Sequence, residues 1–306
     1  MECQSSPAHH SGSQFIAILK VACFFVFAGR AWQHLVWDAP FRALLWDQRL
    51  MEGVVTFLTG ADWNSYVTNP AVDRGIQIMI RCAGWFYVVA ALCVWLVRKD
   101  RKWMGWVLWG GAFLLVFLSF LECKERAFQL GVMLEHVIQI ACPVLLWAWV
   151  FGKVTLGRWM LYARLAIAAT FIGHGLYAVG FYPQPGGFVD MLIHVFGMSE
   201  PAARSFLQVA ACMDFIVGIA IFFSQVAGPF LLYAVGWGLL TAFARIAANF
   251  YVDFFWESIN QYAFEVMVRL SHGLLPLVLY SFMRSAFKKS AGTGHGYGSQ
   301  QEGATC

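Results

Sequence analysis

The stretch Trp103–Leu121 reads WMGWVLWGGAFLLVFLSFL and contains no charged side chain. A helix needs about 20 predominantly apolar residues to cross the hydrocarbon core of a bilayer, so this stretch predicts a transmembrane helix. Only helices and closed barrels satisfy every backbone polar group in lipid, and an apolar run of this length indicates a helix. Because similar runs recur along the chain, we expect an all-α, polytopic membrane protein.

The composition extends this expectation to the whole chain. Hydrophobic residues make up 60% and charged residues 12% of the 306 residues, whereas soluble domains carry about 25% charged residues. The net charge is only +4. The positive residues form short clusters between apolar runs, a pattern typical of topology control and unlike a nucleic-acid surface. We therefore expect the lipid bilayer as a partner and no nucleic acid.

The apolar runs predict eight transmembrane helices. The predicted spans are Phe15–Trp37, Gly75–Val97, Trp103–Leu121, Phe128–Val150, Trp159–Phe181, Phe206–Val226, Pro229–Phe250 and Tyr262–Phe282.

The distribution of Lys and Arg in the short loops predicts the orientation of the chain. Basic residues gather in segments 98–102, 153–158 and 284–289, which share one side if there are eight spans. Both the N-terminal segment 1–14 and the C-terminal segment 285–306 should then be cytoplasmic. The Gly/Ser/Gln-rich composition of the C-terminal segment predicts disorder.

The chain shows a weak internal duplication. The matching positions are Lys20 with Arg164, Ala22 with Ala166, Phe27 with Phe171, Gly29 with Gly173, Cys82 with Cys212, and Pro143 with Pro276. We therefore predict two four-helix repeats, residues 15–151 and 152–284. Because each repeat has an even number of spans, the two should be parallel and related by a pseudo-two-fold axis along the membrane normal.

Each repeat also has a long outer loop after its first span. In the first repeat, residues 38–60 should form a helix that lies on or dips into the outer leaflet, with Asp38 as its cap and its end near Gly60. The second repeat has a shorter counterpart, Phe188–Phe196, which ends at Gly197.

Ionisable side chains at bilayer depth are costly and are candidates for function. The candidates for ligand binding or proton relay are Arg30, His34, Arg81, Glu135, His136, His174, Asp214, Arg245, Glu265, Arg269 and His272. Glu135 could neutralise Arg30 or Arg81, while Asp214 could pair with Arg269 and Glu265 with Arg245. The alternative interpretation is that these groups are structural ion pairs between helices. Their number at one depth favours a ligand pocket open to the outer face.

Haem and metal ions are less favoured interpretations of the histidines. His136 and His174 are the only pair at matching depth for bis-histidine haem ligation, and helix-packing histidines are commoner than haem ligands. The sequence contains no HExxH, no Walker A and no GxSxG motif. We therefore predict no metal site, and catalytic residues remain unknown at this stage.

The second repeat resembles the DoxX-like family of four-helix membrane proteins. The resemblance rests on Ala163-Arg164-Leu165-Ala166 leading into Phe171-Ile172-Gly173-His174-Gly175-Leu176, and on Phe206 to Phe223 with Gly218 near its end. It covers about 60 residues. In the first repeat, Gly29-Arg30 replaces the Gly-His pair. The resemblance implies a bacterial inner (cytoplasmic) membrane and, for some members, a subunit of a membrane oxidoreductase that passes electrons to quinone.

Three functions therefore remain open. The first is a subunit of a membrane redox complex, with a redox enzyme as partner, in which His34, His136 and His174 contact a quinone or relay protons. The second is a small-solute or lipid transporter that uses a pocket between the repeats. The third is a non-catalytic assembly or scaffold protein. Sequence alone does not separate them, because a polar intramembrane pocket serves all three.

Overall fold

The computed structural model describes residues 7–294, and this part of the chain contains helices and no strands. The long helices are α1 (Pro7–Val36), α5 (Pro70–Leu96), α6 (Lys102–Glu125), α7 (Leu130–Val150), α8 (Leu156–Ala178), α10 (Glu200–Ala220), α11 (Ala227–Ala248), α12 (Phe255–Arg269) and α13 (Ser271–Gly294). The short helices are α2 (Arg42–Leu45), α3 (Gln48–Thr59), α4 (Trp63–Thr68), α9 (Gly186–Phe196) and the 3-10 helix η1 (Val252–Phe254). The all-α prediction is confirmed.

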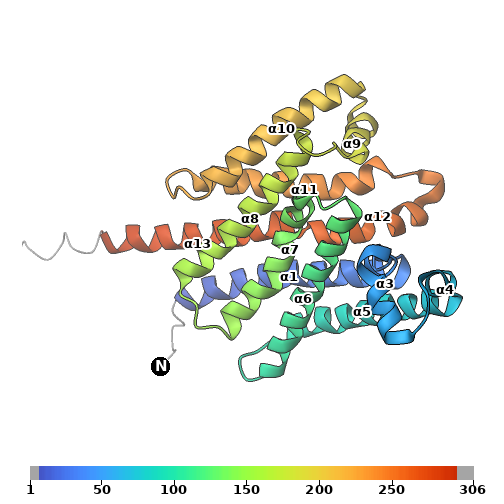
Figure 1. Cartoon of the computed structure of the whole chain (residues 1–306). Helices are drawn as coiled ribbons and strands as arrows, with labels where there is room; N and C mark the ends of the chain where they lie inside the picture. The colour runs from blue at the N-terminus through green and yellow to red at the C-terminus, as the bar shows by residue number, and fades with distance from the viewer. Residues whose placement is uncertain (1–6, 295–306) are drawn as a thin grey trace, which may run out of the picture.

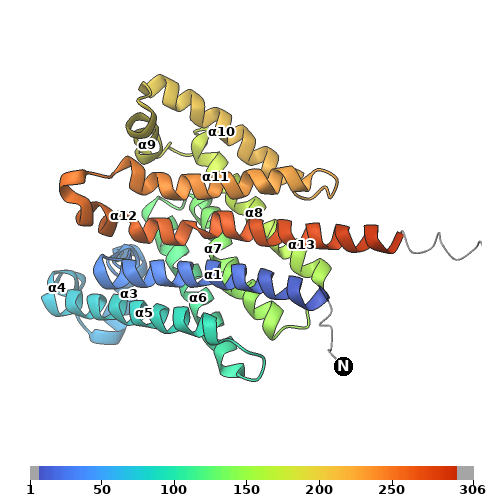
Figure 2. The ribbon, with the colours of Figure 1, turned by 180° about the vertical axis from the view of Figure 1, so that it is seen from behind.

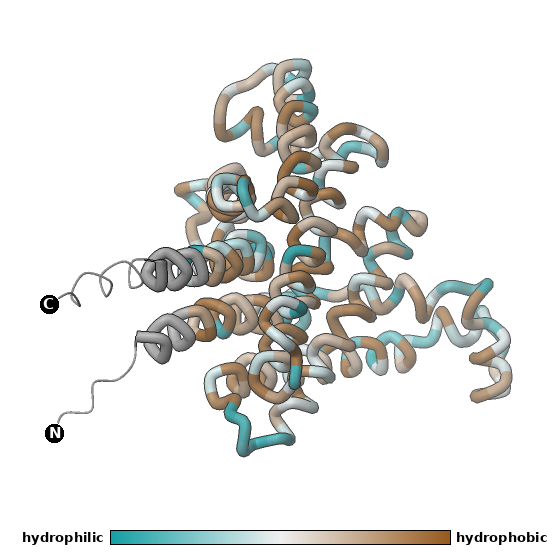
Figure 3. The backbone as a smooth tube through the Cα atoms, turned by 90° about the vertical axis from the view of Figure 1, so that its left-hand side faces the viewer, coloured by the Kyte–Doolittle hydropathy of each residue, from teal (hydrophilic) through white to brown (hydrophobic). Residues whose placement is uncertain are grey.

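Seven segments within the described residues are long and apolar enough to cross a membrane, and α12 with α13 count as one of them. The chain is therefore a multi-pass membrane protein. In Figure 3, hydrophobic residues predominate along the long helices. The predicted fifth span, α8, is 23 residues long but is not among the seven, and Arg158 and Arg164 lower its mean hydropathy.

The positions of the two ends of the chain relate to the number of times that the chain crosses the membrane. Figures 1 and 2 show the start of α1 and the end of α13 at one end of the bundle, and α3, α4 and α9 at the other. Helix α8 runs from the first end toward α9 (Figure 1). Two chain ends on the same side require an even number of crossings, and an eighth crossing by α8 would meet this requirement.

The helices of the two halves pack in the same pattern. Helix α1 packs on α5 as α8 packs on α10, and α6 packs on α7 as α11 packs on α13. Contacts between the halves also match, because α7 lies against α8 while α12 and α13 lie against α1. The last helix of each half therefore covers the first helix of the other.

Two glycines allow these contacts between the halves. A Cβ atom on Gly29 of α1 would lie 2.8 Å from Val268 of α12, and one on Gly173 of α8 would lie 2.9 Å from the backbone nitrogen of Glu135 in α7. Lipid provides no hydrophobic drive for helices to associate, so close backbone approach at small residues supplies the packing energy.

The residues that face these glycines occupy matching positions. Val268 precedes Pro276 by eight residues, and Glu135 precedes Pro143 by the same eight residues. The two glycines therefore contact residues that lie at the same distance in sequence from a proline.

The predicted span Tyr262–Phe282 lies within the candidate membrane span Val252–Ser285. A turn at Leu270 divides it into α12 and α13, where the Ser271 hydroxyl donates to the Val268 carbonyl at 2.8 Å. Two details of the outer loop were predicted wrongly. The predicted outer helix 38–60 is divided into α2 and α3. Its cap is Asp47, whose side chain accepts from the Leu50 backbone, and Asp38 caps no helix.

Other details agree with the structure. Helix α3 ends at Gly60 and α9 ends at Gly197, and both glycines adopt the left-handed conformation that terminates helices. The predicted disordered tail 285–306, in contrast, was wrong for residues 285–294, because α13 continues to Gly294. Residues 1–6 and 295–306 lie outside the described part of the chain, so the predicted terminal disorder concerns residues about which the structure says nothing.

Candidate functional site

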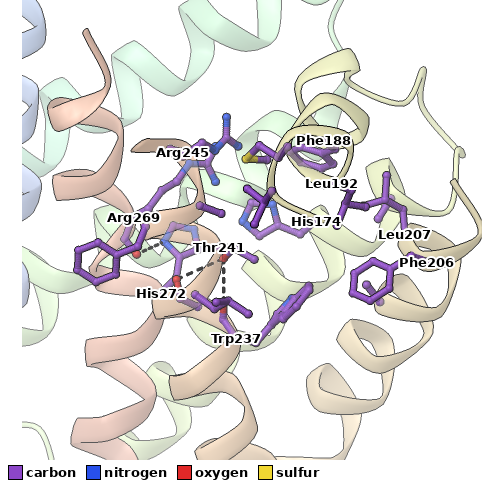
Figure 4. A pocket seen from close by; sticks show the side chains of 18 of the residues that line it. His174, Phe188, Leu192, Phe206, Leu207, Trp237, Thr241, Arg245, Arg269 and His272 are labelled. Carbon is purple, nitrogen blue, oxygen red and sulfur yellow. Dashed lines mark hydrogen bonds between the residues drawn. The ribbon is translucent and has the colours of Figure 1, made fainter. Parts of the chain in front are cut away.

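A cavity of about 270 Å³ lies in the second half of the chain, between α8, α9, α10, α11 and the junction of α12 with α13. Its wall is mostly apolar and aromatic, with Phe171, Phe188, Leu192, Phe206 and Trp237 among the lining residues. Figure 4 shows His174, Thr241 and His272 on one side of this space and Phe206 with Leu207 on the other. The cavity therefore combines an apolar body with a polar end.

His272 is deeply buried at that end, with 4% of its surface exposed. Its Nδ1 lies 3.0 Å from the carbonyl oxygen of Arg269, as the dashed line in Figure 4 marks. Its Nε2 is buried and has no hydrogen-bond partner among the described residues. A buried polar atom without a partner costs free energy, so it indicates a missing ligand atom or water.

His174 lies beside His272 and is paired with an acid. Its Nδ1 is 2.7 Å from a carboxylate oxygen of Glu135, which comes from α7. The rings of His174 and His272 have centroids 5.2 Å apart. The sequence predicted Glu135 as the partner of Arg30 or Arg81, and this prediction was wrong because Glu135 faces α8.

Asp214 of α10 also lines the cavity. It is 3% exposed, and its Oδ1 has no hydrogen-bond partner in the described structure. The predicted pair of Asp214 with Arg269 is absent from the ion pairs of the described residues. An isolated buried carboxylate is costly, so Asp214 is a second candidate to contact a ligand.

Two arginines border the polar end. Arg245 of α11 pairs with Glu265 of α12 at 3.1 Å, which confirms that predicted pair. The Arg245 guanidinium also lies 5.7 Å from the centre of the Phe188 ring. Arg269 lines the cavity as well, and it makes no ion pair among the residues that the structure describes. Arg269 is therefore a cationic donor that a ligand could contact.

The first half contains a compact polar network in place of a cavity of this kind. Arg30 of α1 donates to Gln139 at 2.9 Å, to Gln33 at 2.7 Å and to Glu122 at 3.2 Å. His136 Nε2 lies 3.2 Å from the other oxygen of Glu122. Glu122 is therefore the anion that neutralises this part of the bundle.

Glu122 was missed in the sequence analysis. The predicted third span ended at Leu121, so Glu122 was assigned to a loop, whereas α6 continues to Glu125. The signal was an acidic residue directly after an apolar run, one position beyond the predicted boundary. Helix ends are the least certain feature of a sequence pattern.

The remaining candidates lie away from the cavity. His34 is buried in the first half, where its Nδ1 is 2.7 Å from the Arg30 carbonyl and its ring lies against Tyr87. Arg81 is exposed on α5 and belongs to no ion pair of the described residues. The structure therefore brings His174, Asp214, Arg245, Arg269 and His272 together and separates Arg30, His34, Arg81 and His136 from them.

The structure gives no support to a haem between the halves. His136 and His174 each have a carboxylate within 3.2 Å, from Glu122 and Glu135 respectively. Within residues 7–294, no group of three or more His, Cys, Asp or Glu side chains is arranged to hold a metal ion.

The two halves differ in the hydrogen bonding of one pair of matching positions. Arg30 follows Gly29 as His174 follows Gly173, and Gln139 precedes Pro143 by four residues as His272 precedes Pro276. In the first half, this pair is joined by a direct hydrogen bond. In the second half, the two rings share no hydrogen bond in the described structure and border a cavity.

Comparisons with family models, curated proteins and solved structures found no match to this chain.

Proposed function

We propose that this membrane protein binds a quinone-type lipid in the cavity between α8, α9, α10, α11 and α13. The observation that carries the proposal is the contrast between the halves. Arg30 and Gln139 satisfy each other, whereas at the matching positions His272 has a buried ring nitrogen without a partner. A ligand with a polar head would complete the hydrogen bonding that the second half lacks.

The size and lining of the cavity support a flat apolar head group. Ligand pockets usually measure about 300–1,000 Å³ and are lined by apolar side chains with a few polar groups. A cavity of about 270 Å³ is near the lower limit and suits a single substituted ring. Phe206 and Trp237 can stack on such a ring.

The cavity wall also offers an exit for an isoprenoid tail. Leu240 and Phe243 line the cavity and are each 55% exposed on α11, and Phe196 at the end of α9 is 60% exposed. Large apolar side chains exposed on a membrane helix face lipid, so the tail would leave the cavity sideways into the bilayer.

The residues around the polar end suit the chemistry of such a carrier. A quinone supplies reversible two-electron, two-proton chemistry when it is bound. His174 and His272 can accept or return a proton at Nε2, while Glu135 orients His174 from behind. We extend the proposal to a DoxX-like subunit of eight spans in two repeats, working with a redox enzyme that supplies the electrons.

The proposal is tested by titrating the purified protein in lipid nanodiscs with a short-chain benzoquinone and measuring binding by calorimetry. We expect saturable binding, and the affinity for the reduced form should weaken about fivefold in His272→Phe, the loss expected for one hydrogen bond of about 1 kcal/mol. The matched control is His194→Phe, because His194 is exposed on α9 and does not line the cavity. Absence of binding to both the quinone and its reduced form would contradict the proposal.

A further inference from the structure

The tautomer of His272 is determined by the backbone. Its Nδ1 lies 3.0 Å from the Arg269 carbonyl oxygen, and a carbonyl oxygen can only accept a hydrogen bond. The hydrogen of the neutral ring is therefore on Nδ1, and Nε2 carries a lone pair. The buried atom without a partner is thus an acceptor, and what it lacks is a donor.

In the first half, the acceptor at the matching position has a hydrogen-bond donor. There, the acceptor is the side-chain oxygen of Gln139, and the donor is the Arg30 guanidinium at 2.9 Å. At the position that matches Arg30, the second half has His174, whose Nδ1 is directed to Glu135 at 2.7 Å. Within residues 7–294, the protein therefore supplies no donor to His272 Nε2.

His174 adds a second acceptor to the cavity. Because the Glu135 carboxylate lies against its Nδ1, the Nε2 of a neutral His174 ring also carries a lone pair. Figure 4 shows the two rings side by side at the polar end of the cavity. A donor lines the same space, since Arg269 makes no ion pair among the described residues.

This combination discriminates between head groups. A ketone or a carboxylate only accepts hydrogen bonds, so it could meet Arg269 but would leave His272 Nε2 without a partner. A hydroxyl group donates one hydrogen bond and accepts others, so it can donate to His272 Nε2 and accept from Arg269.

We infer that the cavity selects a ligand whose head group is a hydroxyl, and therefore binds the reduced quinol more tightly than the oxidised quinone. This inference rests on the proposed function. Sites that offer hydrogen bonds to a hydroxyl discriminate strongly against analogues that lack it, because their own buried polar groups are then left unpaired.

The test compares a hydroquinone and its quinone with the same ring and side chain, titrated under anaerobic conditions into the unaltered protein. We expect the hydroquinone to bind at least about tenfold more tightly. An alkylphenol with the same side chain, which is redox-inactive under these conditions, should bind like the hydroquinone. His272→Phe should reduce the preference for the hydroquinone, and His194→Phe should retain it.

The outcomes separate the two proposals. Equal affinity for hydroquinone and quinone would overturn the inference while leaving quinone binding intact. A preference for the hydroquinone that the alkylphenol does not share would also overturn it, because the selection would then not act through the hydroxyl. Binding of neither ligand would overturn the proposed function itself.

Discussion

The imidazole rings of His174 and His272 lie with their centroids 5.2 Å apart, and each is held at Nδ1 by an acceptor from the protein. His174 faces the Glu135 carboxylate and His272 faces the Arg269 carbonyl. The two Nε2 atoms are therefore the free ends of both rings. This arrangement leaves both rings able to accept a hydrogen bond from a donor on a bound ligand.

Filling the cavity should abolish binding without unfolding the protein. Ala210 lines the cavity, so Ala210→Leu would place three extra carbon atoms in empty space. We expect the thermal midpoint to stay the same or rise and hydroquinone affinity to fall at least about tenfold. The matched control is Ala211→Leu. Ala211 is fully buried among packed side chains, so this variant should be less stable than the unaltered protein. Unchanged binding in Ala210→Leu would place the ligand elsewhere.

Gly173→Ala should weaken the contact between the halves. The new Cβ would lie 2.9 Å from the Glu135 backbone nitrogen, so α7 and α8 would have to separate, at a cost of about 1–3 kcal/mol. Gly29→Ala should cost a similar amount, because its Cβ would meet Val268 at 2.8 Å. In the control Gly236→Ala, the new Cβ has no neighbouring atom within 4 Å, so the stability should equal that of the unaltered protein. Equal unfolding temperatures for all three variants would argue against tight contacts at these glycines.

Glu122→Gln should destabilise the first half. Glu122 contacts both Arg30 and His136, and removing its charge leaves a buried guanidinium without an anion. Breaking buried pairs costs about 3–5 kcal/mol. We expect about 2 kcal/mol, because the Glu122 side chain is 20% exposed and water partly screens it. Thermal unfolding in detergent measures the loss. Glu125→Gln is the control, since Glu125 is exposed on the same helix; an equal loss there would exclude a specific role for Glu122.

The attachment of α3 to the bundle should depend on pH. The Lys124 ammonium and the Leu50 backbone N–H both bond the Asp47 carboxylate and hold its pKa below the ordinary value of 3.8. Because the pKa of Asp47 is lowered in the folded protein, its ionised carboxylate stabilises the attachment of α3. This stabilisation is complete above the pKa of Asp47 in the unfolded protein and is lost as the pH falls through its pKa in the folded protein. Protection factors of α3 amides in hydrogen exchange should therefore decrease below about pH 4. Asp47→Asn should lack this pH dependence; an unchanged pH profile would exclude Asp47 as its source.

The two ends of the chain should be on the same side of the membrane. Tags at the N- and C-terminus should be cleaved by protease from one face, because the start of α1 and the end of α13 share an end of the bundle in Figure 1. A membrane-impermeant thiol reagent should label Ala61→Cys, in the loop after α3, from the opposite face only. Tags on opposite faces would mean an odd number of crossings and would exclude α8 as a span.

The sequence by itself determined the class of the protein and much of its helical layout. Long runs such as Trp103–Leu121 lack charges, so they are favourable in lipid. There, a run of this length satisfies its backbone hydrogen bonds by forming a helix. The matching positions of Gly29 and Gly173, and of Pro143 and Pro276, also pointed to equivalent contacts, because small residues and kinks mark where helices approach. The pair Arg245–Glu265 followed from charge and depth alone.

Only the tertiary structure decided which polar groups meet. The sequence gives the depth of a polar side chain along its helix. It does not give the residue that this side chain contacts on a neighbouring helix. Glu135 and His136 are adjacent in sequence, yet they face different helices, α8 and α6. The rotation of α7 thus directs Glu135 to His174 at the cavity and His136 to the closed network. The cavity itself depends on side chains from six helices, and their joint packing leaves a space that no local pattern records.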